Sequence, residues 1–185
     1  MTDGPPLDRA RIIEVLDRHA VEYLVVGGIG AQLHGATRPT ADFDSLPSTT
    51  EENLGRLATA LQDLNAFLRV GGLSDAEARG LPTRLDAVAL SRLEISTWRT
   101  DAGDLDVLTV IRRRDGQPAS FDDLTGRSTQ VRVDGIVVHV AALQDIIDSK
   151  EFADRPKDRE ALDELRSLAG RSRPSWRAAE HDNDD

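Results

Sequence analysis

The stretch that decides the fold runs from residue 25 to residue 45 and reads VVGGIGAQLHGATRPTADFDS. It begins inside a short β-rich run, EYLVV at 22–26, which ends at Gly27-Gly28 and so predicts a strand followed by a turn. Residues 29–34 then predict a helix. A helix that is entered through glycines offers backbone N–H groups and the positive end of its dipole to a phosphate. A tight turn with no ligand is the alternative explanation of the same two glycines.

Two carboxylates stand on the next predicted strand, the alternating segment 41–45. Because side chains alternate along a strand, Asp42 and Asp44 project to one side while Phe43 points into the core. Paired carboxylates repel each other unless a positive charge lies between them. Mg²⁺ suits this position, since it takes one or two carboxylates and lets phosphate oxygens complete its shell. In a chain so rich in acids, two aspartates on an exposed edge strand are the alternative.

A third acid, Asp106, lies inside an otherwise apolar run, the predicted strand at 105–111. An unpaired carboxylate buried there would be strongly unfavourable, so Asp106 needs a partner, and a shared metal would supply one. Asp104 is the rival third acid, because it lies on the same face of the strand as Asp106. A position at the entrance of the strand, facing water, suits Asp104 better than Asp106.

The remaining pattern predicts helices and strands around these motifs. Amphipathic spacing predicts helices, and alternating or β-rich runs predict strands. The expected helices are 8–19, 50–65, 143–153 and 157–169; the expected strands are 93–98, 130–134 and 136–140, with loop and short helices at 70–92. The mixture favours an α/β (α+β) fold, a mixed β-sheet flanked by helices. We expect one domain over 1–169, with a helical C-terminal part at about 141–169 and a disordered tail at 170–185.

Composition limits the partners and the compartment. The chain has 185 residues, a formal net charge of −10 and no cysteine. It lacks both an apolar signal sequence and an apolar run long enough for a membrane span, so we expect no membrane partner and a cytoplasmic protein. An acidic chain would bind a polynucleotide only through a local basic patch. Arg112–Arg114 is the candidate run, and a solvated loop is its alternative.

Lysine is rare in this sequence. Lys150 and Lys157 are its only lysines, and both lie in the segment KEFADRPKD at 150–158. In a chain that otherwise uses arginine, a lysine suggests a position that needs a compact point charge.

Together these motifs resemble the nucleotidyltransferase superfamily, in which Gly-Gly or Gly-Ser after a strand precedes two acids separated by one apolar residue, with a third acid on a later strand. More narrowly, residues 10–168 resemble the AbiEii-type and MenT-like toxin nucleotidyltransferases. The residues that carry the narrower resemblance are His34-Gly35, Arg38, Thr40, Asp42, Asp44, Asn53-Leu54, Lys150, Arg155, Lys157 and Asp158. Ser45 departs from the family, which has an apolar residue there, and this weakens the expectation of a fully embedded strand.

The resemblance implies a role for each site residue. Asp42, Asp44 and Asp106 would bind one or two Mg²⁺ ions, and Asp106 would complete the site or act as base. Gly27, Gly28, Arg38 and Thr40 would receive the triphosphate of an NTP. Lys150 and Lys157 would hold phosphates or the departing pyrophosphate, and Asp158 would orient one of the lysines. Surface charges for the two lysines, and a helix cap for Asp158, are the structural alternatives.

The resemblance also implies a function. The expected protein is an enzyme of the EC 2.7.7 type, the toxin of a toxin–antitoxin pair. It would transfer NMP, for which a pyrimidine nucleotide is the first candidate, from an NTP to the 3′ end of tRNA, and so block translation until a cognate antitoxin restrains it. Two alternatives stay open: transfer to a small molecule or a protein hydroxyl, and an inactive nucleotidyltransferase fold that only binds a partner.

Overall fold

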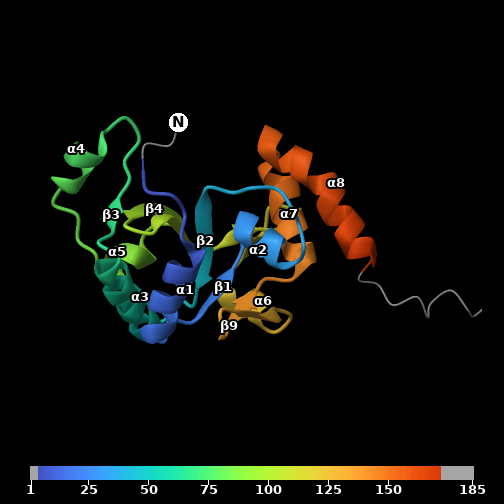
Figure 1. The fold of residues 1–185 in the computed structure, drawn as a ribbon, viewed down its shortest axis with the longest axis horizontal. Coiled ribbons are helices and arrows are strands. Elements are labelled where there is room, and N and C mark those ends of the chain that lie inside the picture. Colours follow the sequence, from blue (N-terminus) through green and yellow to red (C-terminus); the bar gives the residue numbers. More distant parts are fainter. Residues whose placement is uncertain (1–3, 172–185) are drawn as a thin grey trace, which may run out of the picture.

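The structure is a computed structural model that describes residues 4–171. Helices and strands are mixed along the chain, and Figure 1 shows their arrangement. They are α1 (Arg9–Arg18), β1 (Tyr23–Val25), α2 (Gly27–Leu33), β2 (Asp42–Pro47), α3 (Glu51–Asp63), β3 (Phe67–Leu68), α4 (Asp75–Arg79), α5 (Ala87–Ser91), β4 (Ile95–Thr100), β5 (Gly103–Leu108), β6 (Ile111–Arg112), β7 (Pro118–Ala119), α6 (Phe121–Thr125), β8 (Thr129–Val133), β9 (Ile136–Val140), α7 (Leu143–Ala153) and α8 (Pro156–Arg171).

Seven of the strands form one mixed sheet in the order β3-β4-β5-β2-β1-β9-β8. The pairs β2–β5 and β1–β9 are parallel, and the other neighbours are antiparallel. Strands β6 and β7 form a separate small sheet. This architecture confirms the predicted mixed α/β fold with C-terminal helices. It also places β2, the strand of the paired acids, at the centre of the large sheet.

The two faces of the sheet belong to two different hydrophobic cores. On one face Phe43 and Leu105 are fully buried and pack with Ile12 of α1 and Leu54 of α3. Burying side chains of this size contributes roughly 1.5–3 kcal/mol each. On the other face Leu46 packs into a second core with residues of α7 and α8. Asp42 and Asp44 alternate with Phe43 and share the face of Leu46, so they lie on the side of α7 and α8.

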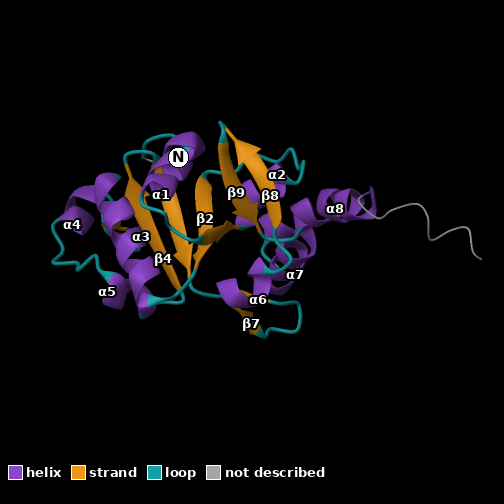
Figure 2. Cartoon of the chain, turned by 90° about the horizontal axis from the view of Figure 1, so that it is seen from below, coloured by secondary structure: helices purple, strands orange, loops and turns teal. Residues whose placement is uncertain are grey.

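The helices that cover these faces gather at opposite ends of the molecule. Figures 1 and 2 both show α3, α4 and α5 toward one end and α7 and α8 toward the other. The acids of β2 and β5 therefore lie on the part of the sheet between two groups of helices that are distant in sequence.

Several local features of the structure follow from short-range sequence signals. Thr50 caps α3 by accepting a hydrogen bond from the backbone N–H of Asn53 at 3.3 Å. Asp134 and Gly135, with φ values of 49° and 90°, form the turn between β8 and β9, as the Asp-Gly pair predicts. Helix α7 has the predicted bounds.

Other boundaries differ from the prediction for tertiary reasons. Helix α2 begins at Gly27 rather than at residue 29. Strand β4 runs to Thr100 because it pairs along its whole length with β5, and the predicted strand at 105–111 is divided into β5 and β6. The short elements β3, β7 and α6 were not predicted.

Helix α8 continues through Arg171, beyond the predicted end of the helix at residue 169. The rest of the predicted tail, 172–185, lies outside the described residues. Within residues 4–171, none of the helices has the length and apolar character that crossing a bilayer requires.

Candidate active site

The parallel pairing of β2 with β5 brings the acids of the two strands into one row. Asp44 lies opposite Asp106, and Asp42 lies opposite Asp104. The electrostatic contacts agree, since the charges of Asp42 and Asp106 both act on Asp44. The predicted convergence of Asp42, Asp44 and Asp106 from separate parts of the sequence is therefore present in the fold.

Asp104 is already neutralised by two arginines. Its carboxylate accepts Arg99 Nε at 2.5 Å and Arg69 Nη1 at 2.7 Å, and only 13 % of its side chain is exposed. The alternative in which Asp104 faces water does not apply, because Arg99 lies opposite it on β4. With Asp104 committed to these ion pairs, Asp106 is the acid left available beside Asp44.

Asp106 has no such cation attached. One of its carboxylate oxygens, Oδ1, is buried without a hydrogen-bond partner. Burial raises the pKa of Asp106, and a hydrogen bond from the Thr97 hydroxyl offsets part of that rise. A buried carboxylate oxygen without a partner costs free energy unless a cation or a proton donor satisfies it.

Among the acids of this row, Asp44 has the environment that most disfavours its ionised form. Burial, together with the charges of Asp42 and Asp106, raises its pKa to about 6, and a hydrogen bond from the Gly28 N–H to Oδ2 at 3.4 Å acts the other way. A bound cation would relieve this repulsion. Asp42 differs, because the Thr40 hydroxyl donates to its Oδ1 at 2.7 Å.

The glycine turn fits closely around these acids. Gly27 has φ 59°, and a Cβ built there would lie 1.9 Å from Asp44 Oδ2. A Cβ at Gly28 would lie 2.5 Å from Thr40 Oγ1. Both positions therefore need glycine for close approach, and Gly27 needs it for its positive φ as well.

Cationic side chains and the acids line one pocket, which we call the cation-lined pocket. Residues from the stretch 27–44 that line it include Gly27, Gly28, Arg38, Thr40, Asp42 and Asp44, and those from α7, α8 and the turn between them include Lys150, Arg155 and Lys157. Lys150 acts electrostatically on Asp44, Lys157 on Asp106, and Arg155 on both Asp44 and Asp42. Each predicted triphosphate residue therefore borders this pocket. Arg38 also forms an ion pair with Glu160 of α8 at 2.7 Å.

Asp158 lies beneath the cations rather than in the pocket. It is fully buried and accepts Lys150 Nζ at 3.1 Å and Arg155 Nε at 2.5 Å. Burial acts to raise its pKa, but the hydrogen bonds from Arg155 and Lys150 outweigh burial and hold the pKa below its ordinary value. Asp158 thus stays charged and fixes both cations, as a residue that orients Lys150 would.

Sequence reasoning gave no role to Arg155 or Thr97. Arg155 was recognisable, because it lies three residues before Asp158 on the chain and forms an ion pair with it. Thr97 could not be recognised, since only the register of β4 against β5 places it opposite Asp106.

The strand that contains Ser45 is fully embedded, although its polar side chain weakened that expectation. Ser45 is 1 % exposed, and its hydroxyl donates to the Asp106 carbonyl at 3.0 Å. This internal hydrogen bond allows a polar residue in a fully embedded strand.

The acids suit a divalent cation bound together with phosphates. As they stand, no three histidine, cysteine, aspartate or glutamate side chains within residues 4–171 form a group that could hold a metal ion alone. Mg²⁺ is usually bound by one or two carboxylates plus substrate phosphates rather than by an all-protein cage. The unpartnered Asp106 oxygen and the raised pKa of Asp44 fit such a cation.

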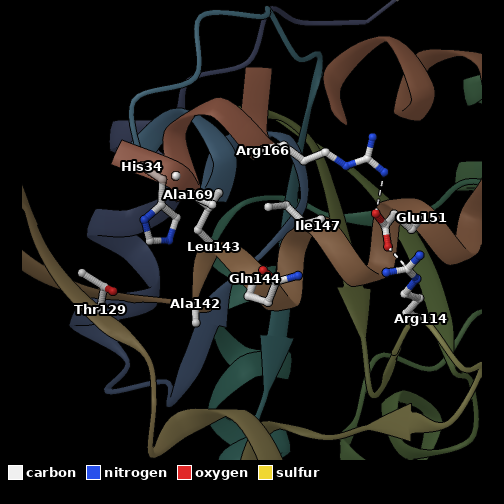
Figure 3. A pocket seen from close by; sticks show the side chains of 11 residues that line it. His34, Arg114, Thr129, Ala142, Leu143, Gln144, Ile147, Glu151, Arg166 and Ala169 are labelled. Atoms are coloured by element: carbon white, nitrogen blue, oxygen red, sulfur yellow. Dashed lines mark hydrogen bonds and ion pairs between the residues drawn. The ribbon is translucent and has the colours of Figure 1, made fainter. Parts of the chain in front are cut away.

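A larger hollow of about 730 Å³ lies elsewhere, beside α7 and the end of α8, and contains none of these acids. Figure 3 shows Glu151 between Arg114 and Arg166, with ion pairs of 3.1 and 2.6 Å. Arg112 likewise pairs with Glu94 at 2.5 Å. The predicted basic patch at Arg112–Arg114 is therefore largely neutralised by acids.

Comparison with known proteins supports the fold. The sequence matches no protein-family model and no curated protein. Among solved structures, the chain is similar to the lincosamide antibiotic adenylyltransferase LnuA with lincomycin bound, at 14 % identity and a TM-score of 0.57, over 88 % of this chain and 99 % of that one. It is also similar to ANT(2″)-Ia in complex with adenylyl-2″-tobramycin, at 16 % identity and a TM-score of 0.52, over 88 % and 92 %. The chain thus has the fold of these nucleotidyltransferases.

Proposed function

We propose that this protein is a nucleotidyltransferase that binds an NTP with a divalent cation and transfers the nucleotide to an acceptor hydroxyl. The observation that carries the proposal is the cation-lined pocket, which Asp42 and Asp44 line together with Lys150, Arg155 and Lys157. Its carboxylates suit a metal, and its cations suit phosphates. We also propose that the chain forms a single domain. We further propose that it acts in the cytoplasm, where NTPs are available.

Each residue has a defined part in the transfer. Asp42 and Asp44 would hold the cation or cations with Asp106 beside them, and the cation would neutralise charge on the reacting phosphates. The acceptor oxygen attacks the α-phosphorus, the bond to the β-phosphate breaks, and pyrophosphate leaves. Asp106, which is only partly buried, would take the proton of the acceptor hydroxyl. Lys150 and Lys157 would stabilise the charge on the leaving pyrophosphate.

For the acceptor we propose the 3′ end of tRNA, with the chain acting as a toxin held in check by an antitoxin. The support is the sequence signature at Arg38, Thr40, Asp42 and Asp44, which resembles that of toxin nucleotidyltransferases. A small-molecule acceptor is the second candidate, because LnuA and ANT(2″)-Ia are described with antibiotics.

A labelled transfer assay tests the proposal. Each α-³²P-labelled NTP is incubated with Mg²⁺, total tRNA and the native chain, and in parallel with lincomycin and tobramycin. Label in tRNA supports the first acceptor, and label in an antibiotic supports the second. Asp42→Ala should reduce transfer by roughly a hundredfold or more. Asp122→Ala, at an exposed aspartate of α6, is the matched control and should keep full activity.

The result that would overturn the proposal is equal turnover by the native chain and Asp42→Ala. Absence of NTP binding in a calorimetric titration with Mg²⁺ would favour an inactive fold that only binds a partner.

A further inference from the structure

A second pocket borders β4, which is separated from β2 by β5 in the order of the sheet. It has a volume of about 280 Å³ and lies where β3, the loop after it and α4 meet β4. Arg69, Val70, Gly71, Leu73 and Thr97 are among its lining residues, and we call it the β4 pocket.

The order of the strands puts Asp106 between the two pockets. Asp44 on β2 borders the cation-lined pocket, Asp106 lies next to it on β5, and Thr97 lies opposite Asp106 on β4. The Thr97 hydroxyl also donates to Asp106. An NTP in the cation-lined pocket and a second molecule in the β4 pocket would therefore meet at Asp106 from opposite sides.

We propose that the β4 pocket receives the 3′-terminal nucleotide of an RNA acceptor, with its hydroxyl at Asp106 and its phosphate at Arg69. This inference rests on the proposed function and names the place of the acceptor. The carboxylate of Asp106, which is only partly buried and is hydrogen-bonded to Thr97 of the pocket, accepts the hydroxyl proton as the acceptor oxygen bonds to the α-phosphorus and pyrophosphate departs on the other side. A hydroxyl approaching from the β4 side is thereby opposite the leaving group, as in-line transfer requires.

Arg69 makes a polyanionic acceptor the favoured occupant. Its ion pair with Asp104 uses Nη1 and neutralises part of its charge. The side chain nevertheless lines the pocket and is 44 % exposed, so its other guanidinium N–H groups can meet a phosphate. The pocket's carboxylate, Asp75, is paired with Arg99 at 3.1 Å, which leaves it poorly suited to hold a cationic antibiotic.

Apolar side chains give the acceptor base a surface. Val70 and Leu73 line the pocket and are 36 % and 41 % exposed. Ile95, two residues before Thr97 on the same strand face, is 59 % exposed. Exposed apolar residues gathered beside a polar site are typical of binding surfaces, and single-stranded ends are bound through their bases as well as their phosphates.

Removal of the phosphate contact tests the proposal. Binding of fluorescently labelled total tRNA is followed by anisotropy, and binding of NTP with Mg²⁺ by calorimetry. Arg69→Ala should weaken tRNA binding by about tenfold and leave NTP affinity unchanged. The slope of log K for tRNA against log salt concentration should become shallower by about one, as expected for the loss of one phosphate contact. Arg84→Ala, at an 85 % exposed arginine paired with Asp86, is the matched control.

Filling the pocket provides a second test. A Cβ at Gly71 meets nothing within 4 Å, so Gly71→Phe adds a ring at the pocket without a clash of its Cβ. This variant should raise KM for tRNA and leave KM for NTP unchanged. Gly126→Phe, at another position with nothing within 4 Å, is its control.

Three results would overturn the acceptor assignment: no tRNA binding by the native chain, equal tRNA affinity in Arg69→Ala and Arg84→Ala, or equal KM for tRNA in Gly71→Phe and Gly126→Phe. If the proposed function itself were wrong, the native chain would instead fail to bind NTP.

Discussion

Asp44 is the residue whose environment is least compatible with its own charge. Burial and two neighbouring aspartates raise its pKa to about 6, whereas its ordinary value is 3.8. A protein that did not need a negative charge at this place would be more stable without it. A cation that binds here would relieve this repulsion, and the relief would contribute to the free energy of its binding.

Asp44→Asn should therefore stabilise the metal-free chain. Because the native pKa lies above the unfolded value, ionisation favours the unfolded state. The penalty is absent below about pH 4, grows between pH 4 and 6 and is constant above about pH 7. With EDTA present, we expect the free energy of unfolding of Asp44→Asn to exceed that of the native chain by roughly 3 kcal/mol at pH 8 and to equal it near pH 4.

Urea unfolding at several pH values measures this difference. Asp122→Asn, at an exposed position, controls for the loss of one negative charge from an acidic chain. Equal stability of Asp44→Asn and the native chain at pH 8 would show that Asp44 is not strained by its neighbours.

At the scale of elements, the turn between β1 and α2 decides whether the acids and the pocket fit together. Gly27 has a positive φ and a side-chain position already filled by Asp44. Gly55, in the interior of α3, has a negative φ and nothing within 4 Å of its Cβ position. The same substitution should therefore have opposite effects at the two glycines.

We expect Gly27→Ala to destabilise the chain by at least about 2 kcal/mol and to abolish transfer, because both backbone strain and a clash result. Gly55→Ala should instead stabilise it by about 0.5–1 kcal/mol, since alanine is the better helix former. Thermal unfolding of both variants measures the contrast. A stable, fully active Gly27→Ala would contradict the fit between the turn and Asp44.

The sequence predicted the elements whose signals are local and missed those that depend on pairing. The bounds of helix α7 follow from local spacing, and they were predicted correctly. The cap at Thr50 and the turn at Asp134-Gly135 likewise follow from local capping and turn chemistry. Strand β3 exists because two residues pair with β4, and no alternation marks so short a segment. Within the site, alternation gave the shared side of Asp42 and Asp44. The choice of Asp106 over Asp104 needed the β4 register, which brings Arg99 to Asp104 and Thr97 to Asp106.

At the scale of the whole molecule, the proposed site is shared between two structural units. The acids stand on β2 and β5, whose other face packs in the core with α1 and α3. Lys150, Arg155 and Lys157 stand on α7, α8 and the turn between them, which pack in the second core. An NTP bound with a cation would connect the two units, because the metal would join the acids and the phosphates would join the cations.

This arrangement predicts that Mg²⁺ and NTP stabilise the chain synergistically. Either alone meets only the acids or only the cations of the cation-lined pocket, so each should raise the Tm slightly. At saturating concentrations, the pair should raise it by about 5–10 °C, more than the sum of the separate shifts. Differential scanning calorimetry with each of the four NTPs, and with NaCl at matched ionic strength, measures the effect. Asp42→Ala removes a carboxylate from the pocket and Lys150→Met removes a cation, so each variant should lose the synergy. Asp122→Ala should keep it. Additive shifts in the native chain would mean that metal and nucleotide do not meet in this pocket.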